Sequence, residues 1–140
     1  MPTTVQKSMR LPEDIVREIN DMARTMKKDF TAMANELLDE AIRSHRCPGI
    51  VFSEGVSGRR ARIAGTGIEV WEIIAAYKSA GKILKRLLQS YHWMTEQQVK
   101  AAVGYYSHYP SEIDDLIEEN ENWTPERIMQ KHPFLAAGRQ

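Results

Sequence analysis

The segment Thr4–Pro12 constrains the fold more than any other part of the chain, because it reads as a strand with no second strand to follow it. Apolar and polar residues alternate along it, which is the pattern of a half-buried strand. One face carries Val5, Lys7, Met9 and Leu11, and the other carries Gln6, Ser8 and Arg10. A lone strand cannot satisfy its own backbone hydrogen bonds. The simplest solution is an antiparallel ribbon formed with the same strand of a second chain.

Two amphipathic helices are predicted after this strand. Pro12 ends the strand because it has no N–H for a ladder, and it suits the first turn of a helix that runs to about Thr25. The apolar stripe of this helix is Ile15, Ile19, Met22 and Met26. A second helix is expected from Thr31, as its N-cap, to about His45. Its stripe is Met33, Ala34, Leu37, Leu38, Ala41 and Ile42.

The distribution of charge says more about partners than the net charge does. The 19 basic and 19 acidic residues of this 140-residue chain cancel, which argues weakly against nucleic acid. Basic residues nevertheless gather near the N-terminus and in the middle of the chain, and acidic residues gather at 112–126. Such a chain could bind DNA with one part and a basic partner with another.

Several classes of protein are disfavoured. No apolar run approaches the length of a membrane span, and the N-terminus lacks a signal pattern, so a cytoplasmic location is expected. The single cysteine, Cys47, excludes an intramolecular disulfide. The pair His45 and Cys47 has no second pair at zinc spacing, so no metal and no cofactor is expected. No acid, base and nucleophile converge, so an enzyme is not expected.

The first third of the chain resembles the ribbon-helix-helix family (Arc/MetJ/CopG-type). The resemblance is carried by Met9–Glu13, the Lys28–Thr31 turn and Leu37–Ile42. It implies an intertwined dimer over residues 1–46, with the ribbon in the major groove of DNA. On this pattern the base readers are Gln6, Ser8 and Arg10, and the start of the second helix, at Thr31 and its neighbours, contacts a phosphate. The basic residues Lys7, Lys27 and Lys28 are further candidates for phosphate contacts.

The sequence departs from that family at two places. Lys7 stands where the family usually has an apolar residue, and Lys28-Asp29 stand where the loop often has a glycine. Either Lys7 reaches out to a phosphate, or the register of the strand differs from the one assumed.

A second domain is expected beyond Cys47–Gly49, over residues 50–121, followed by a tail at 122–140. The pattern predicts a β-hairpin, a glycine-containing turn and then four helices. The hairpin comprises Ile50–Phe52 and Arg59–Ile63 around a turn at Gly55–Gly58. The helices are expected at Val70–Ala80, around Ile83–Tyr91, after the capping box at Thr95, and from Pro110. A last helical turn is expected from Thr124.

This second half resembles the domain-of-unknown-function family numbered 433. The resemblance is carried by Arg62–Trp71, by Trp93–Thr95 and by Ala101–Tyr106. It implies a small tri-helical or winged-helix-like fold and the role of an antitoxin of the VapB type, whose toxins are PIN-like ribonucleases. Many members have an arginine where Gly67 stands, so no role of that arginine transfers to this chain.

Two further surfaces are candidates for binding. One is a basic surface for DNA or for a partner: Arg59, Arg60, Arg62, Lys82, Lys85 and Arg86. The other is an acidic element for a toxin, with two apolar anchors in the tail: Glu112, Asp115, Glu119, Phe134 and Leu135. Each of these sets is also compatible with a simple solvated surface. The turn Gly65–Gly67 lacks the lysine of a phosphate-binding loop, so we interpret it as structural.

The chain as a whole is therefore expected to be mainly α. The leading hypothesis is a dimeric, sequence-specific DNA-binding antitoxin that represses its own operon and neutralises a PIN-like ribonuclease. Its partners would be a second copy of itself, double-stranded operator DNA and the toxin. The alternative is a transcription regulator without a toxin, whose second domain serves oligomerisation or ligand sensing.

Overall fold

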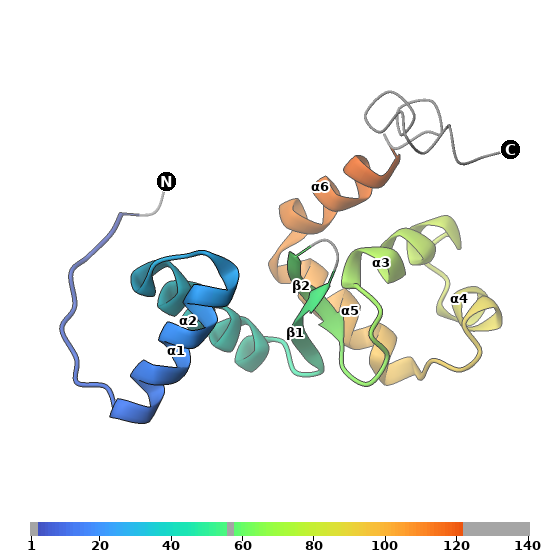
Figure 1. Ribbon diagram of the computed structural model, residues 1–140. Coiled ribbons are helices and arrows are strands. Elements are labelled where there is room, and N and C mark those ends of the chain that lie inside the picture. The colour runs from blue at the N-terminus through green and yellow to red at the C-terminus, as the bar shows by residue number, and fades with distance from the viewer. Residues whose placement is uncertain (1–2, 56–57, 122–140) are drawn as a thin grey trace, which may run out of the picture. The chain divides into compact units, whose positions relative to one another are not determined.

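The computed structural model describes residues 3–55 and 58–121. In this part of the chain there are six helices and a two-stranded antiparallel hairpin (Figure 1). The chain divides into two compact units, residues 1–42 and residues 43–140. The division lies inside the second helix, a few residues before the predicted boundary at Cys47–Gly49. No helix in the described ranges has both the length and the apolar character to cross a membrane.

Unit 1 contains an extended segment followed by two helices, as the sequence predicts. Residues 3–12 form neither helix nor strand, and the carbonyl of Pro12 accepts from the Val16 N–H at the start of the first helix. Helix α1 spans Glu13–Met26, and helix α2 spans Phe30–Arg46 and continues into unit 2. Both helices lie within about one residue of their predicted bounds.

The loop between α1 and α2 corrects two details of the prediction. Lys27 has a left-handed backbone with a φ of 55°. The loop position that favours glycine is therefore Lys27, one residue before the Lys28-Asp29 pair at which it was predicted. The Lys28 N–H donates to the carbonyl of Ala23 at 2.9 Å, which closes the C-terminus of α1. The Asp29 carboxylate accepts from the Ala32 N–H at 2.7 Å. Asp29 therefore caps α2, and the assignment of Thr31 as N-cap was wrong. Aspartate and threonine are both common N-cap residues, and the sequence did not show which of Asp29 and Thr31 directly precedes the helix.

Unit 2 begins with the predicted hairpin. Strand β1 spans Ile50–Gly55 and strand β2 spans Gly58–Ile63. Ile50 pairs with Ile63, and Phe52 pairs with Ala61, so these side chains share the face that packs on the core. Gly49 precedes β1 with a φ of 90°, and a Cβ there would lie 3.0 Å from the Cβ of Ala101. That position therefore requires glycine.

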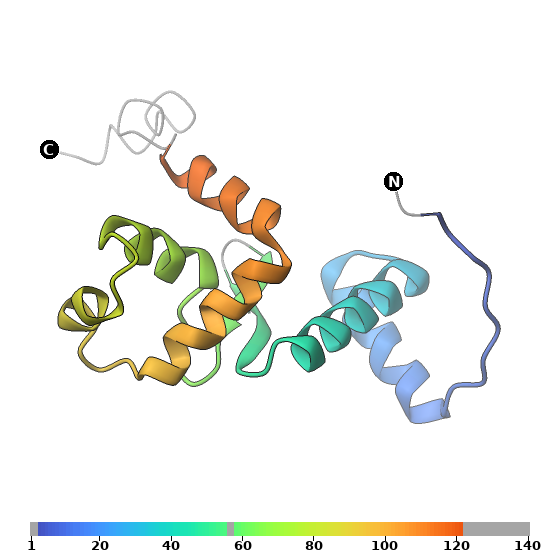
Figure 2. The same cartoon turned by 180° about the vertical axis from the view of Figure 1, so that it is seen from behind.

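Four helices complete unit 2, and α5 lies at its centre (Figures 1 and 2). They are α3 (Val70–Ser79), α4 (Leu84–Ser90), α5 (Glu96–His108) and α6 (Pro110–Glu121). Helix α5 contacts α3, α4, α6 and both strands. The predicted capping box at Thr95 is confirmed: its Oγ1 accepts from the Gln98 N–H at 3.1 Å, and its own N–H donates to the Gln98 side chain at 2.9 Å.

The turn before α3 is held by its own hydrogen bonds. Gly65 and Gly67 have φ values of 81° and 72°, which glycine adopts without strain. The Thr66 hydroxyl donates to the carbonyl of Ile63 at 2.8 Å and accepts from the Ile68 N–H at 3.0 Å. This geometry is that of a structural strand-to-helix turn.

Candidate nucleic-acid interface

The extended segment of unit 1 is uncovered on both faces. The predicted base readers Gln6, Ser8 and Arg10 are exposed. The apolar residues between them are exposed as well: Val5 retains 81% of its accessible surface and Met9 retains 68%. A strand-like segment with one apolar face that is exposed to solvent indicates a surface that another element covers.

A hollow of about 800 Å³ lies between this segment and the two helices of unit 1. Lys7, Met9 and Leu11, all assigned to the inner face of the strand, line it. The opposite wall consists largely of the apolar stripes of α1 and α2: Ile15, Ile19, Met22, Ala34, Leu37 and Leu38. Ser8 also lines the hollow, although the alternation places it on the outer face. The hollow is thus an apolar space with a few polar groups at its edge.

Unit 1 buries little of its own apolar surface. Among its described residues, the buried apolar side chains are Ala23 and Met33. Ile15, Leu38 and Ile42, which belong to the predicted apolar stripes, are exposed. A unit of this size with so small a core is marginal without further cover.

The basic side chains of unit 1 differ in whether they form ion pairs with acidic residues. Lys7 and Arg10 are exposed in a segment, residues 3–12, that contains no acidic residue. Lys28 forms an ion pair with Glu36. Lys27 is exposed and, in the described part of the chain, makes no ion pair. Thr31 is exposed in the first turn of α2, but the Asp29 carboxylate also lies at that helix start and disfavours a phosphate there.

The six residues of the predicted basic surface do not form one patch. Arg60 pairs with Glu69 at 3.4 Å, and Arg62 donates to the carbonyl of Gly67 at 2.9 Å. The three basic residues near α4 are exposed: Lys82, Lys85 and Arg86. Strand β2 and helix α4 are not in contact, and α3 and α5 each contact both (Figures 1 and 2).

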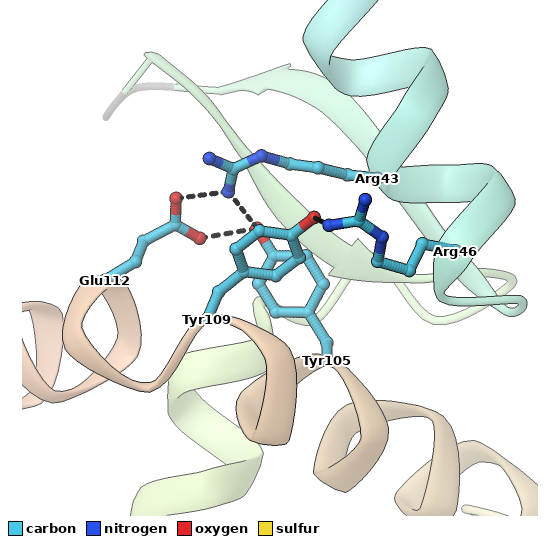
Figure 3. Close-up of polar contacts among 5 residues, drawn as sticks. All are labelled: Arg43, Arg46, Tyr105, Tyr109 and Glu112. Carbon is cyan, nitrogen blue, oxygen red and sulfur yellow. Dashed lines mark hydrogen bonds and ion pairs between the residues drawn. The ribbon is translucent and has the colours of Figure 1, made fainter. Parts of the chain in front are cut away.

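A polar cluster of unit 2 was not predicted from the sequence (Figure 3). The Arg43 guanidinium donates to the Tyr105 hydroxyl at 2.8 Å and to the Glu112 carboxylate at 2.7 Å. The Tyr105 hydroxyl in turn donates to Glu112 at 2.5 Å. The Arg43 guanidinium also lies 4.2 Å from the centre of the Tyr109 ring, and Arg46 donates to the Tyr109 hydroxyl at 3.2 Å.

Burial and charge make this cluster a stable structural unit. Tyr105 is fully buried, and burial together with its hydrogen bond to Glu112 raises the pKa of its hydroxyl. Burial lowers the pKa of Arg43, but its hydrogen bond to Tyr105 and its attraction to Tyr105 and Glu112 outweigh that effect and raise it. Glu112, assigned to a toxin surface, is therefore engaged inside unit 2.

The other residues assigned to a toxin surface have different positions. Asp115 and Glu119 are exposed on α6. Phe134 and Leu135, like the helical turn expected from Thr124, lie outside the described residues.

A second pair of contacts ties α6 to the rest of unit 2. The Asp114 carboxylate accepts from the Tyr106 hydroxyl at 2.7 Å and lies 3.1 Å from the Lys78 ammonium. The hydrogen bond from Tyr106 and the ion pair with Lys78 lower the pKa of Asp114. The only sequence signal for both clusters was a tyrosine followed seven or eight residues later by an acid. In one continuous helix this spacing would place the two residues on the same face but two turns, about 10 Å, apart. The break before Pro110, where α6 begins, is what lets them touch.

Across residues 3–55 and 58–121, no three histidine, cysteine, aspartate or glutamate side chains gather into a group that could hold a metal ion. Cys47 is buried in the core of unit 2, and burial raises the pKa of its thiol.

We expect Tyr105→Phe to destabilise the protein more than Tyr106→Phe does. Tyr105 is fully buried, and its hydroxyl accepts from the partly buried Arg43 guanidinium as well as donating to Glu112. Removing it breaks both bonds and leaves an Arg43 donor without this acceptor, which costs about 1–3 kcal/mol in the free energy of unfolding. The Tyr106 hydroxyl bonds to an exposed carboxylate that water can solvate, so its loss has a smaller effect. Urea unfolding followed by circular dichroism measures both. Equal losses would show that the buried cluster contributes no more than the surface pair.

Comparison with known proteins identifies part of the chain. Residues 50–106 match the family model described as "Protein of unknown function (DUF433)". The crystal structure of a DUF433 member protein from Anabaena variabilis is 29% identical to this chain, covering 77% of this chain and 86% of that one, with a TM-score of 0.44. No curated protein matches the chain. The resemblance found in the second half is thus confirmed over part of its length, and residues 50–106 form a domain of the DUF433 family.

Proposed function

We propose that this protein is a dimeric, sequence-specific DNA-binding antitoxin that represses its own operon. Unit 1 would form a ribbon-helix-helix dimer, and the DUF433 domain would bind a toxin. The observation that supports the dimer best is the exposed segment 3–12, which has alternating side chains and borders an apolar hollow.

A second copy would provide both backbone hydrogen-bond partners for this segment and cover for its apolar side chains. Within the described chain, residues 3–11 make no backbone hydrogen bond, so their N–H and C=O groups are available to another strand. Antiparallel pairing with the same segment of a second copy would satisfy these groups through a symmetric interface. It would also cover Val5, Met9 and the apolar stripes of α1 and α2.

DNA recognition follows from the opposite face of the ribbon. With the apolar face turned inward, Gln6, Ser8 and Arg10 point outward, and a two-stranded ribbon fits the major groove. Arginine suits the edge of guanine and glutamine suits that of adenine. Lys7 and Lys27 would contact phosphates, whereas the partners of Lys28 and Thr31 make these two weaker candidates.

The toxin-binding part of the proposal is supported by the surface of α6. This helix exposes several acidic side chains: Asp115, Glu118, Glu119 and Glu121. A basic groove of a nuclease would complement them. The alternative, a regulator that senses a ligand, is favoured by one observation, a pocket in unit 2 that is described below.

The dimer can be tested with one substitution on each face of the segment. Met9→Asp places a charge on the proposed inner face, and we expect sedimentation velocity to show a monomer. Gln6→Asp introduces the same side chain on the outer face and should leave the dimer intact. A wild-type protein that is monomeric at micromolar concentration would refute the ribbon, as would equal effects of the two substitutions.

Substitutions at Arg10 and Lys27 should have different effects on sequence-specific and non-specific DNA binding. On a duplex from upstream of the protein's own gene, Arg10→Ala should lose affinity by about fivefold to 150-fold per lost base contact, with little loss on a scrambled duplex of equal length. Lys27→Ala should weaken binding to both duplexes alike, because a phosphate contact carries no sequence information. Fluorescence anisotropy at fixed salt measures both. Equal losses for Arg10→Ala would assign Arg10 to a phosphate.

Toxin binding should depend on the charge of α6. Co-expression with the product of the adjacent gene should give a stable complex, and Glu119→Lys should weaken it, most strongly at low salt. Glu96→Lys, on the exposed side of α5, makes the same charge change away from this surface and should have no such effect. An adjacent product that neither binds nor is toxic would favour the alternative regulator.

A further inference from the structure

A pocket of about 330 Å³ lies in unit 2 among the hairpin, α3 and α6, whose positions can be followed in Figure 2. Its walls include the aromatic rings of Phe52 and Trp71 and the apolar side chains of Ala61, Ile113 and Leu116. Its charged lining consists of Arg59, Arg60, Glu112 and Asp115. The volume lies at the lower end of the range for ligand pockets, which suits a single side chain or a small molecule.

The charged groups of the pocket differ in what neutralises them. Arg60 is paired with Glu69, and Arg59 also has a partner. Glu112 already interacts with Arg43 and Tyr105. Asp115 is exposed and, among the residues that the structure describes, makes no hydrogen bond or ion pair. The carboxylate of Asp115 is therefore the charge that an occupant of the pocket can neutralise.

We infer that this pocket receives an arginine side chain of the protein partner. A guanidinium binds a carboxylate through two parallel hydrogen bonds, which the unpaired Asp115 can accept. Its flat face also stacks on aromatic rings such as those of Phe52 and Trp71. Arginine inserted in a pocket at the centre of an interface is a common source of binding energy.

The pocket is continuous with the acidic surface of α6. Glu119 lies one helical turn beyond Asp115, so a basic partner that approaches α6 would bring its arginine to the pocket. The inference rests on the proposed toxin-binding role of this helix and names the group that would anchor the toxin. Part of the pocket also lies outside residues 50–106, because Glu112, Asp115 and Leu116 belong to α6.

The isolated protein tests this inference without any toxin. The probe is N-acetyl-arginine amide, and its control is N-acetyl-citrulline amide, which has nearly the same shape but no charge. Proton–nitrogen NMR should show a saturable shift of the Trp71 indole signal with the arginine probe at millimolar concentration. That signal is assigned by its loss in Trp71→Phe. The citrulline probe should bind at least about tenfold more weakly.

Two matched variants locate the charge. Asp115→Asn should weaken binding of the arginine probe about tenfold or more, whereas Glu96→Gln removes one carboxylate charge from α5, outside both the pocket and the acidic surface of α6, and should leave binding unchanged. The absence of a saturable shift, equal binding of citrulline, or an unaltered affinity of Asp115→Asn would each overturn the inference. If the complex with the adjacent gene product still forms and still responds to Glu119→Lys, the proposed function stands and only this occupant is wrong.

Discussion

Unit 1 exposes an apolar surface that its own described residues leave uncovered. Residues 3–11 of its extended segment have no backbone partner within the described chain, and its helices turn Ile15, Leu38 and Ile42 to solvent. The burial of apolar surface is the main favourable term in folding, and a unit made of one short segment and two helices can bury only a small apolar area by itself. The proposed dimer and the proposed DNA-reading face both follow from this shortage, because covering one face of the segment leaves only the polar face outward.

Unit 2 meets the same requirement within a single chain. The hairpin and four helices enclose a core in which α5 touches every other element, and Tyr105 lies fully buried at its centre. The cost of burying the Tyr105 hydroxyl is offset by its bonds with Arg43 and Glu112. These bonds join the end of α2 and the start of α6 to α5. These contacts therefore fix the position of α6, with its acidic face and the pocket beside it, relative to α5.

Charge in this chain is organised by local pairing more than by its total. Arg60 and Lys78 have acidic partners inside unit 2, and Lys28 has one inside unit 1. Arg10 on the extended segment and Asp115 on α6 have no such partner among the residues that the structure describes, and they are among the groups that we propose to contact DNA and a basic partner. A sequence shows how many charges a chain has, but the exposed and unpaired ones decide what it can bind.

The sequence by itself determined the local elements of this protein. The hairpin, the glycine turn, the capping box at Thr95 and the bounds of most helices were predicted, because alternation, capping and helical period depend on residues within about four positions. The tertiary structure decided which distant residues meet. Arg43 reaches Tyr105 and Glu112 across 62 and 69 residues of chain, and Glu112, although exposed, is paired with Arg43 and with the fully buried Tyr105. The break at Pro110 set the angle between α5 and α6 that makes this possible, and no periodic pattern encodes that angle.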